Sequence, residues 1–182
     1  MMAVKYPYFS LYETALLSLC GAFVFVAKTM IKIPLHVPGH SGFFIAIPFI
    51  IGAGLVKKPG AATYIGLISG LLFSFFGLEP LHLFDVFKYV AMGLVVDAVS
   101  VLFAFRMENP AVGFIAGAAG NIAKMAVNYS VHILLGVPAT FIILGIGISS
   151  VTFLVCGGIG GAIGALVIGR LLRAGVIGGH GT

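Results

Sequence analysis

The chain has 182 residues, of which 60% are hydrophobic and only 8% are charged, and its mean hydropathy is +1.19. Because soluble domains carry about three times that charged fraction, the composition excludes a soluble globular protein. The formal net charge of +5 comes from cations spread over separate segments, which argues against nucleic-acid binding. We therefore expect a single integral membrane domain over residues 1–182.

Apolar segments separated by proline, glycine and charged residues recur along the whole chain. They predict an all-α, polytopic membrane helix bundle of about six transmembrane helices, at residues 11–30, 43–56, 61–78, 83–105, 111–136 and 139–172. The second helix is short for a span, so it either begins in the preceding loop or inserts partly. The last is too long to cross a bilayer straight, so we expect tilt, a kink or a surface extension.

The cations of the connecting segments predict the orientation of the bundle. Six spans put both termini on one side, and most cations fall on that side: Lys5, Lys57, Lys58, Arg106, Arg170 and Arg173. Only Lys28 and Lys32 fall near the other side. By the positive-inside rule, we expect a multi-pass protein of the cell (cytoplasmic) membrane with both termini in the cytoplasm.

The fifth predicted helix carries a row of polar residues within an otherwise apolar segment. Asn121, Lys124, Asn128 and His132 are spaced by three, four and four residues, which places them on one face of a helix. Lipid cannot solvate such a row, so it should face the bundle interior or a wet cavity. The row predicts the floor of a ligand site.

Other polar residues gather near the outer membrane face of the predicted topology. Pro34 and Pro38 stiffen the first outer loop, which we expect to act as a lid carrying His40. The candidate substrate-binding residues are His40, Lys88, Tyr89, Asn121, Lys124, Asn128 and His132. Simpler roles remain open: Lys88 could reach the interface, and the asparagines could form interhelical hydrogen bonds. The inner halves of the helices are nearly bare of polar groups, which favours a pocket open to the outside over a channel.

Asp97 is the only carboxylate deep in a predicted span, and Lys124 lies at comparable predicted depth. Either group alone would be costly in hydrocarbon, so a mutual ion pair is the structural interpretation. The functional interpretation is that one of them contacts a charged group of the substrate.

Small residues recur every four positions on several helices: Gly157, Gly161, Ala165 and Gly169 on the last, Gly66 and Gly70 on the third, and Ser18 and Ala22 on the first. Such faces let helices approach closely. They indicate either packing inside the bundle or a docking face for a partner.

Three segments, KTMIKIPLHVPGHSGFF, GLVKKPGAATYIGLISGLL and GNIAKMAVNYSVHILLG, together with the helix count, resemble substrate-binding subunits (S components) of energy-coupling factor (ECF) transporters. The resemblance covers essentially the whole chain. It implies a subunit that binds a small vitamin or precursor from outside and works with a transmembrane coupling subunit and two ATPase subunits. In that family an AxxxA-type motif on the first helix contacts the coupling subunit; the nearest match here is Ala15, Ser18 and Ala22. Metal-transporting members carry a histidine close to the N-terminus, which MMAVKYPYF lacks.

The sequence contains no GxxxxGK[ST] nucleotide-binding motif and no nucleophile–base set for hydrolysis. We therefore expect neither an enzyme nor a bound cofactor or metal, and ATP hydrolysis would occur on partner subunits. The alternative function is a small membrane subunit of a respiratory or ion-translocating complex, in which Asp97, Lys124 and His132 relay protons. Such a relay needs ionisable groups through the whole membrane depth, and the inner half of the predicted bundle has almost none.

Overall fold

A computed structural model of the protein describes residues 8–30, 41–77, 82–136 and 139–175. These residues form six α-helices and one short 3₁₀ helix, and they contain no strand. The helices are α1 (Leu11–Met30), α2 (Gly42–Val56), α3 (Ala61–Phe76), α4 (Asp85–Leu102), α5 (Pro110–Leu134) and α6 (Ala139–Arg173), with η1 (His82–Phe84) before α4. The predicted all-α helix bundle is confirmed.

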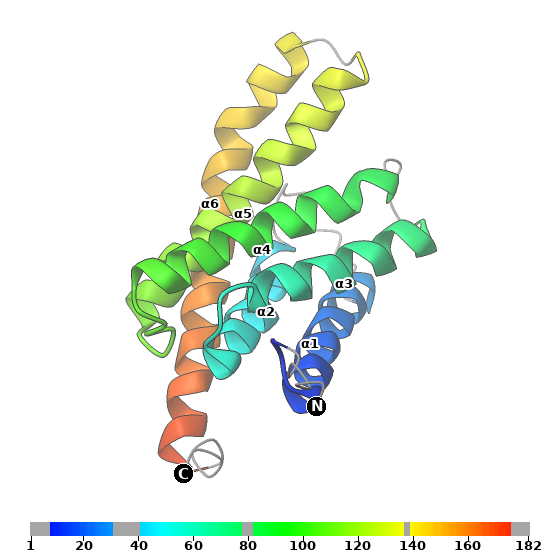
Figure 1. Ribbon diagram of the computed structural model, residues 1–182. Helices are drawn as coiled ribbons and strands as arrows, with labels where there is room; N and C mark the ends of the chain where they lie inside the picture. The colour runs from blue at the N-terminus through cyan, green and yellow to red at the C-terminus, as the bar shows by residue number, and fades with distance from the viewer. Residues whose placement is uncertain (1–7, 31–40, 78–81, 137–138, 176–182) are drawn as a thin grey trace.

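Successive helices run in opposite directions, so α1 begins at the end of the bundle where α6 finishes (Figure 1). The Lys58 ammonium donates to the Glu13 carboxylate at 2.7 Å, which ties the α2–α3 turn to the start of α1. We call this end of the molecule the cation-rich end, because its turns and helix ends carry Lys57, Lys58, Arg106, Arg170 and Arg173.

Local hydrogen bonds explain where two of the helices begin and end. Ser10 and Glu13 form a reciprocal capping box at the start of α1, with Ser10 N–H donating to the Glu13 carboxylate at 2.7 Å and Glu13 N–H donating to Ser10 Oγ at 3.2 Å. The α4 helix ends three residues earlier than predicted, because Ala104 and Phe105 adopt left-handed φ values of 50° and 57°. Phe105 N–H then donates to the Ser100 carbonyl at 2.7 Å and closes the helix end.

Three helical segments of the described chain are long and apolar enough to cross a membrane: Leu11–Met30, Pro110–Leu134 and Ser149–Arg173. The α2 helix has 15 residues and is about 22 Å long, less than a hydrocarbon core of about 30 Å. It lies inside the bundle against α1, α3 and α6, and most of its residues are buried. Its short length is tolerated because protein, rather than lipid, surrounds its backbone. The α6 helix is unbroken, and with α5 it extends beyond the other helices (Figure 1).

The helices pack as two close pairs, α3 with α4 and α5 with α6, and glycines form the contact in each pair. A Cβ atom placed on Gly157 would lie 2.6 Å from the Gly117 carbonyl oxygen, and one placed on Gly113 would lie 2.5 Å from the Gly161 carbonyl oxygen. The α5 and α6 backbones are therefore in direct contact. The small-residue face of α6 was interpreted either as a packing face or as a docking face for a partner. The structure shows that it packs inside the bundle.

The predicted ion pair between Asp97 and Lys124 is wrong. One Asp97 carboxylate oxygen accepts from Ala62 N–H at 3.0 Å, and the other accepts from Thr63 N–H at 2.8 Å and Thr63 Oγ1 at 2.6 Å. Asp97 thus caps the N-terminus of α3, where the helix dipole favours a negative charge. The cap residue of that helix, Gly60, has no side chain to serve this purpose.

The two residues lie at different depths, which explains the wrong pairing. Asp97 is five residues before the end of α4, whereas Lys124 is fourteen residues after the start of α5. The end of α4 and the start of α5 meet at one turn, so a rise of ~1.5 Å per residue separates them by about 13 Å in depth. The alternative function, a respiratory or ion-translocating subunit, requires a proton relay through Asp97, Lys124 and His132. The contact between the first two residues of that relay is absent.

We predict that Gly117→Ala lowers the stability of the bundle while Gly147→Ala does not. The added methyl group at Gly117 meets the Gly157 carbonyl oxygen, and such overpacking costs about 1–3 kcal/mol. Gly147 is the matched control, because it is also helical but has no atom within 4 Å of the place that an added methyl group would occupy. Alanine there gains up to ~1 kcal/mol in helix propensity. Thermal unfolding in detergent should rank the variants in this order, and equal melting temperatures would contradict the close α5–α6 contact.

We also predict that Asp97→Ala destabilises the protein by about 1–3 kcal/mol, because it leaves buried donors at the start of α3 without an acceptor. Asp97→Asn keeps one acceptor oxygen and should cost less. In a double-mutant cycle with Lys124→Met, the two effects should add within ~0.5 kcal/mol, since the residues are not in contact. A coupling energy well above that value would show that Asp97 and Lys124 interact directly, as the predicted ion pair requires.

Candidate functional site

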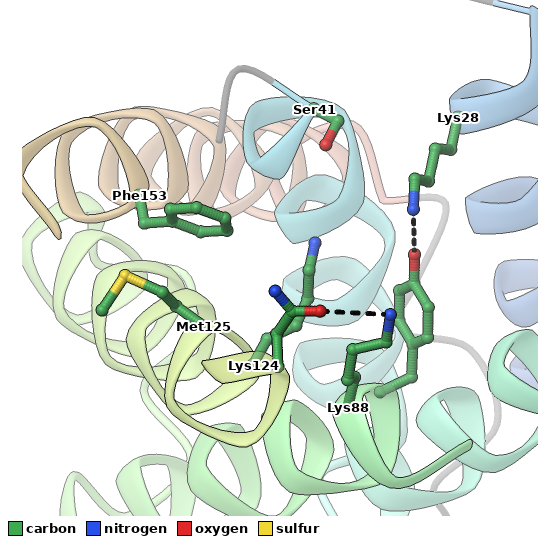
Figure 2. A pocket seen from close by; sticks show the side chains of 8 residues that line it. Lys28, Ser41, Lys88, Lys124, Met125 and Phe153 are labelled. Carbon is green, nitrogen blue, oxygen red and sulfur yellow. Dashed lines mark hydrogen bonds between the residues drawn. The ribbon is translucent and has the colours of Figure 1, made fainter. Parts of the chain in front are cut away.

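A cavity of about 170 Å³ lies at the end of the bundle opposite the cation-rich end. Four helices and the residue before α2 contribute to its wall, which consists of Lys28, Ser41, Lys88, Tyr89, Lys124, Met125, Asn128 and Phe153. We call it the lysine pocket. Figure 2 shows Lys28 on one side, Phe153 and Met125 on the other, and Lys88 and Lys124 between them.

Lys28 reaches the pocket from the last turn of α1. It continues the buried face of that helix, which is formed by Leu17, Gly21 and Val24 at helical spacing. The Lys28 ammonium donates to Tyr89 Oη at 3.2 Å. It also lies 4.7 Å from the centroid of the Phe73 ring, within the range of a cation–π contact.

Tyr89 is the aromatic centre of the site. Its side chain is 1% exposed, and its ring stacks on Phe73 with a centroid separation of 4.9 Å and an interplanar angle of 10°. Gly66 on α3 packs directly against the Tyr89 backbone and so allows this close stacking. The Lys124 ammonium lies 5.4 Å from the Tyr89 ring centroid and 5.8 Å from that of Phe153. The Tyr89 ring therefore contacts two of the three lysines.

Lys88 comes from the first turn of α4 and is 5% exposed. It forms an ion pair with Asp85, one helical turn earlier, and donates to Asn128 Oδ1 at 3.4 Å. The Asp85 side chain is fully buried. The α4 helix thus points a charged pair into the bundle, and Lys88 does not extend toward the membrane surface.

The structure brings together four of the seven predicted substrate-binding residues: Lys88, Tyr89, Lys124 and Asn128. Asn121 is fully buried, and its side-chain amide donates to the Phe153 carbonyl at 2.9 Å. Gly42 and Gly157 pack directly on it, so Asn121 forms an interhelical contact outside the pocket wall. His132 is half-buried and does not line the pocket, and His40 lies outside the described residues.

Four pocket residues were not among the sequence-based candidates: Lys28, Ser41, Met125 and Phe153. The sequence does contain a signal that Lys28 faces the bundle interior, because this residue continues the helical spacing of Leu17, Gly21 and Val24. Its charge instead placed it among the cations near the outer membrane face. Met125 and Phe153 are apolar residues in apolar helices, and nothing in the sequence distinguishes them from lipid-facing positions.

The three predicted docking residues on α1 do not share one exposed face. Ala15 is exposed, and Ala22 is half-buried. The Ser18 hydroxyl lies 3.3 Å from Tyr64 Oη on α3, so this side chain points into the bundle. Within the described residues, no group of three or more histidine, cysteine, aspartate or glutamate side chains is arranged to hold a metal ion.

Comparison with known proteins gives two findings. A family model described as "ABC-type cobalt transport system, permease component" matches residues 11–123. A solved structure described as "Crystal structure of an S-component of ECF transporter" superimposes with a TM-score of 0.65 and 20% sequence identity, covering 93% of this chain and 88% of that one. The comparison with curated proteins gives no match. The fold of an S component, which the sequence resemblance implied, is thereby confirmed.

Proposed function

Because the chain belongs to the family of permease components of ABC-type cobalt transport systems, we propose that it is the membrane subunit that captures a small solute from outside. The solute is then delivered for ATP-driven uptake by a partner module. The observation that carries this proposal is the lysine pocket, where buried charged and polar side chains from separate helices converge on one cavity. Buried ionisable groups in a membrane bundle are costly and are characteristic of substrate sites.

The position of the pocket supports entry from outside. The pocket lies where α1 ends and α4 begins, whereas five cations occupy the turns and helix end at the opposite, cation-rich end. The positive-inside rule assigns the cation-rich end, and with it both termini, to the cytoplasm. The pocket then opens toward the external face of the cell membrane.

The partners in this proposal are a transmembrane coupling subunit and two ATPase subunits, since the sequence itself carries no nucleotide-binding motif. We propose the first helix as the docking element, with Ala15, Ser18 and Ala22 at its small-residue positions. Ala15 is the most accessible of the three, so it is the position at which a partner helix would make direct contact.

We propose an organic solute, a vitamin or vitamin precursor, rather than a bare cobalt ion. The pocket wall described above contains three lysines and no carboxylate, imidazole or thiol. Divalent transition metals bind through those three groups, and the ammonium groups would repel them.

The proposed orientation predicts which positions are accessible from each side of the membrane. In a variant without Cys20 and Cys156, cysteines at positions 57 and 106 should react with a membrane-impermeant thiol reagent only after permeabilisation. A cysteine at position 83 is the matched control, because Leu83 is 69% exposed at the other end of the bundle and should react in intact cells. Labelling of position 57 or 106 in intact cells would overturn the orientation.

The capture function predicts that a small solute copurifies with the protein and can be identified by mass spectrometry. In calorimetric titrations with that solute, Asn128→Ala should weaken binding by about ten- to a hundredfold, because a lost hydrogen bond in a buried site costs ~1–3 kcal/mol. Asn121→Ala is the control: it should lower the melting temperature without a comparable loss of affinity, since Asn121 lies outside the pocket. Unchanged affinity in Asn128→Ala would mean that the solute binds elsewhere.

A further inference from the structure

Three of the ten lysine and arginine residues of the chain meet at a single small cavity. Lys88 and Lys124 are 5% and 7% exposed, so bulk water does little to solvate their ammonium groups. Burying several like charges together is unfavourable unless an opposite charge is present. The site therefore favours a negatively charged occupant.

The carboxylates of the chain are too few to neutralise these lysines. The whole sequence contains five acidic residues. Three of them lie at the cation-rich end: Glu13, Asp97 and Glu108. Asp85 pairs with Lys88, and Glu79 lies outside the described residues. Even if both Asp85 and Glu79 are counted toward the pocket, three ammonium groups exceed two carboxylates.

Aromatic rings offset part of the cost of these charges without neutralising them. Lys28 and Lys124 each lie within 6 Å of two ring centroids, and such cation–π contacts are attractive. The same wall provides an apolar surface, since Phe153 and Met125 face Lys28 across the pocket (Figure 2). A molecule with an anionic group and a flat apolar body would match both features.

The size of the cavity limits the occupant. A volume of about 170 Å³ lies below the ~300–1,000 Å³ of pockets for drug-sized ligands. The part of the solute that these residues enclose is therefore a small group such as a carboxylated or phosphorylated ring.

We propose that the solute of the lysine pocket is a small organic anion whose carboxylate or phosphate group is bound by Lys28, Lys88 and Lys124. This inference rests on the capture function proposed above and adds the chemical class of the solute. Asn128 accepts a hydrogen bond from Lys88 and so positions its ammonium group, while the rings of Tyr89 and Phe153 pack against the apolar body of the solute.

The test compares benzoate, benzamide and benzamidinium, which share a ring and a planar substituent but are negative, neutral and positive; phenyl phosphate extends the set to a phosphate group. Binding to the detergent-purified protein is measured by calorimetry and ligand-induced thermal shift. We expect benzoate or phenyl phosphate to bind at least about tenfold more tightly than benzamide, because hydrogen bonds to charged groups are the stronger ones. Benzamidinium should bind most weakly. The tighter of the two anions identifies the group as carboxylate or phosphate.

Two variants test the role of the lysines. Lys28→Met and Lys124→Met should lose the preference for benzoate over benzamide, while the melting temperature of the ligand-free protein stays the same or rises because a buried charge is removed. Lys57→Met, an exposed lysine at the cation-rich end, is the matched control and should keep the preference. Retention of the preference in both pocket variants would overturn the assignment of these lysines.

The outcomes separate the inference from the proposed function. Benzamide or benzamidinium binding as tightly as the anions overturns the anion class and leaves the capture function intact. If no probe binds, the charge of the copurifying solute decides: an anion supports the inference, and a neutral or cationic solute overturns it. If no probe binds and no solute copurifies, the capture function fails and the inference fails with it.

Discussion

Direct contact between helix backbones at glycine residues is the constraint on which the rest of this structure depends. In a membrane, the hydrophobic effect does not drive one apolar helix against another, so close packing of small residues and interhelical hydrogen bonds must do so. Here Gly117 and Gly157 join α5 to α6, and Gly66 and Gly93 join α3 to α4. Larger side chains at Gly117 and Gly157 would separate α5 from α6, two of the helices that form the pocket wall.

This packing determines the height and direction of the pocket side chains. Because Gly66 has no side chain, the α4 backbone at Tyr89 packs directly against it. The Tyr89 ring can then stack on Phe73 and direct its hydroxyl toward Lys28. Because α6 approaches α5 closely at Gly157, the Asn121 amide reaches the Phe153 carbonyl and joins the two helices. The buried polar groups thus depend on backbone contacts that contain no polar side chain themselves.

The charges inside the bundle serve two separate purposes. Asp97 stabilises the fold, since its carboxylate replaces the missing side-chain cap of α3. The three pocket lysines instead gather like charges beside one cavity, and buried ionisable groups in a membrane bundle are characteristic of substrate sites.

The sequence by itself determined the class of protein, the number and approximate bounds of the helices, and four pocket residues. Hydropathy and helix breakers are local properties, and Lys88, Tyr89, Lys124 and Asn128 are conspicuous because polar or amphipathic groups are rare in apolar segments. Only the tertiary structure decided that Lys28 and Phe153 complete the pocket, that Asn121 packs helices, and that Asp97 caps α3 instead of pairing with Lys124. These outcomes depend on which helices touch and at what relative height, and glycine contacts between segments distant in the chain determine both.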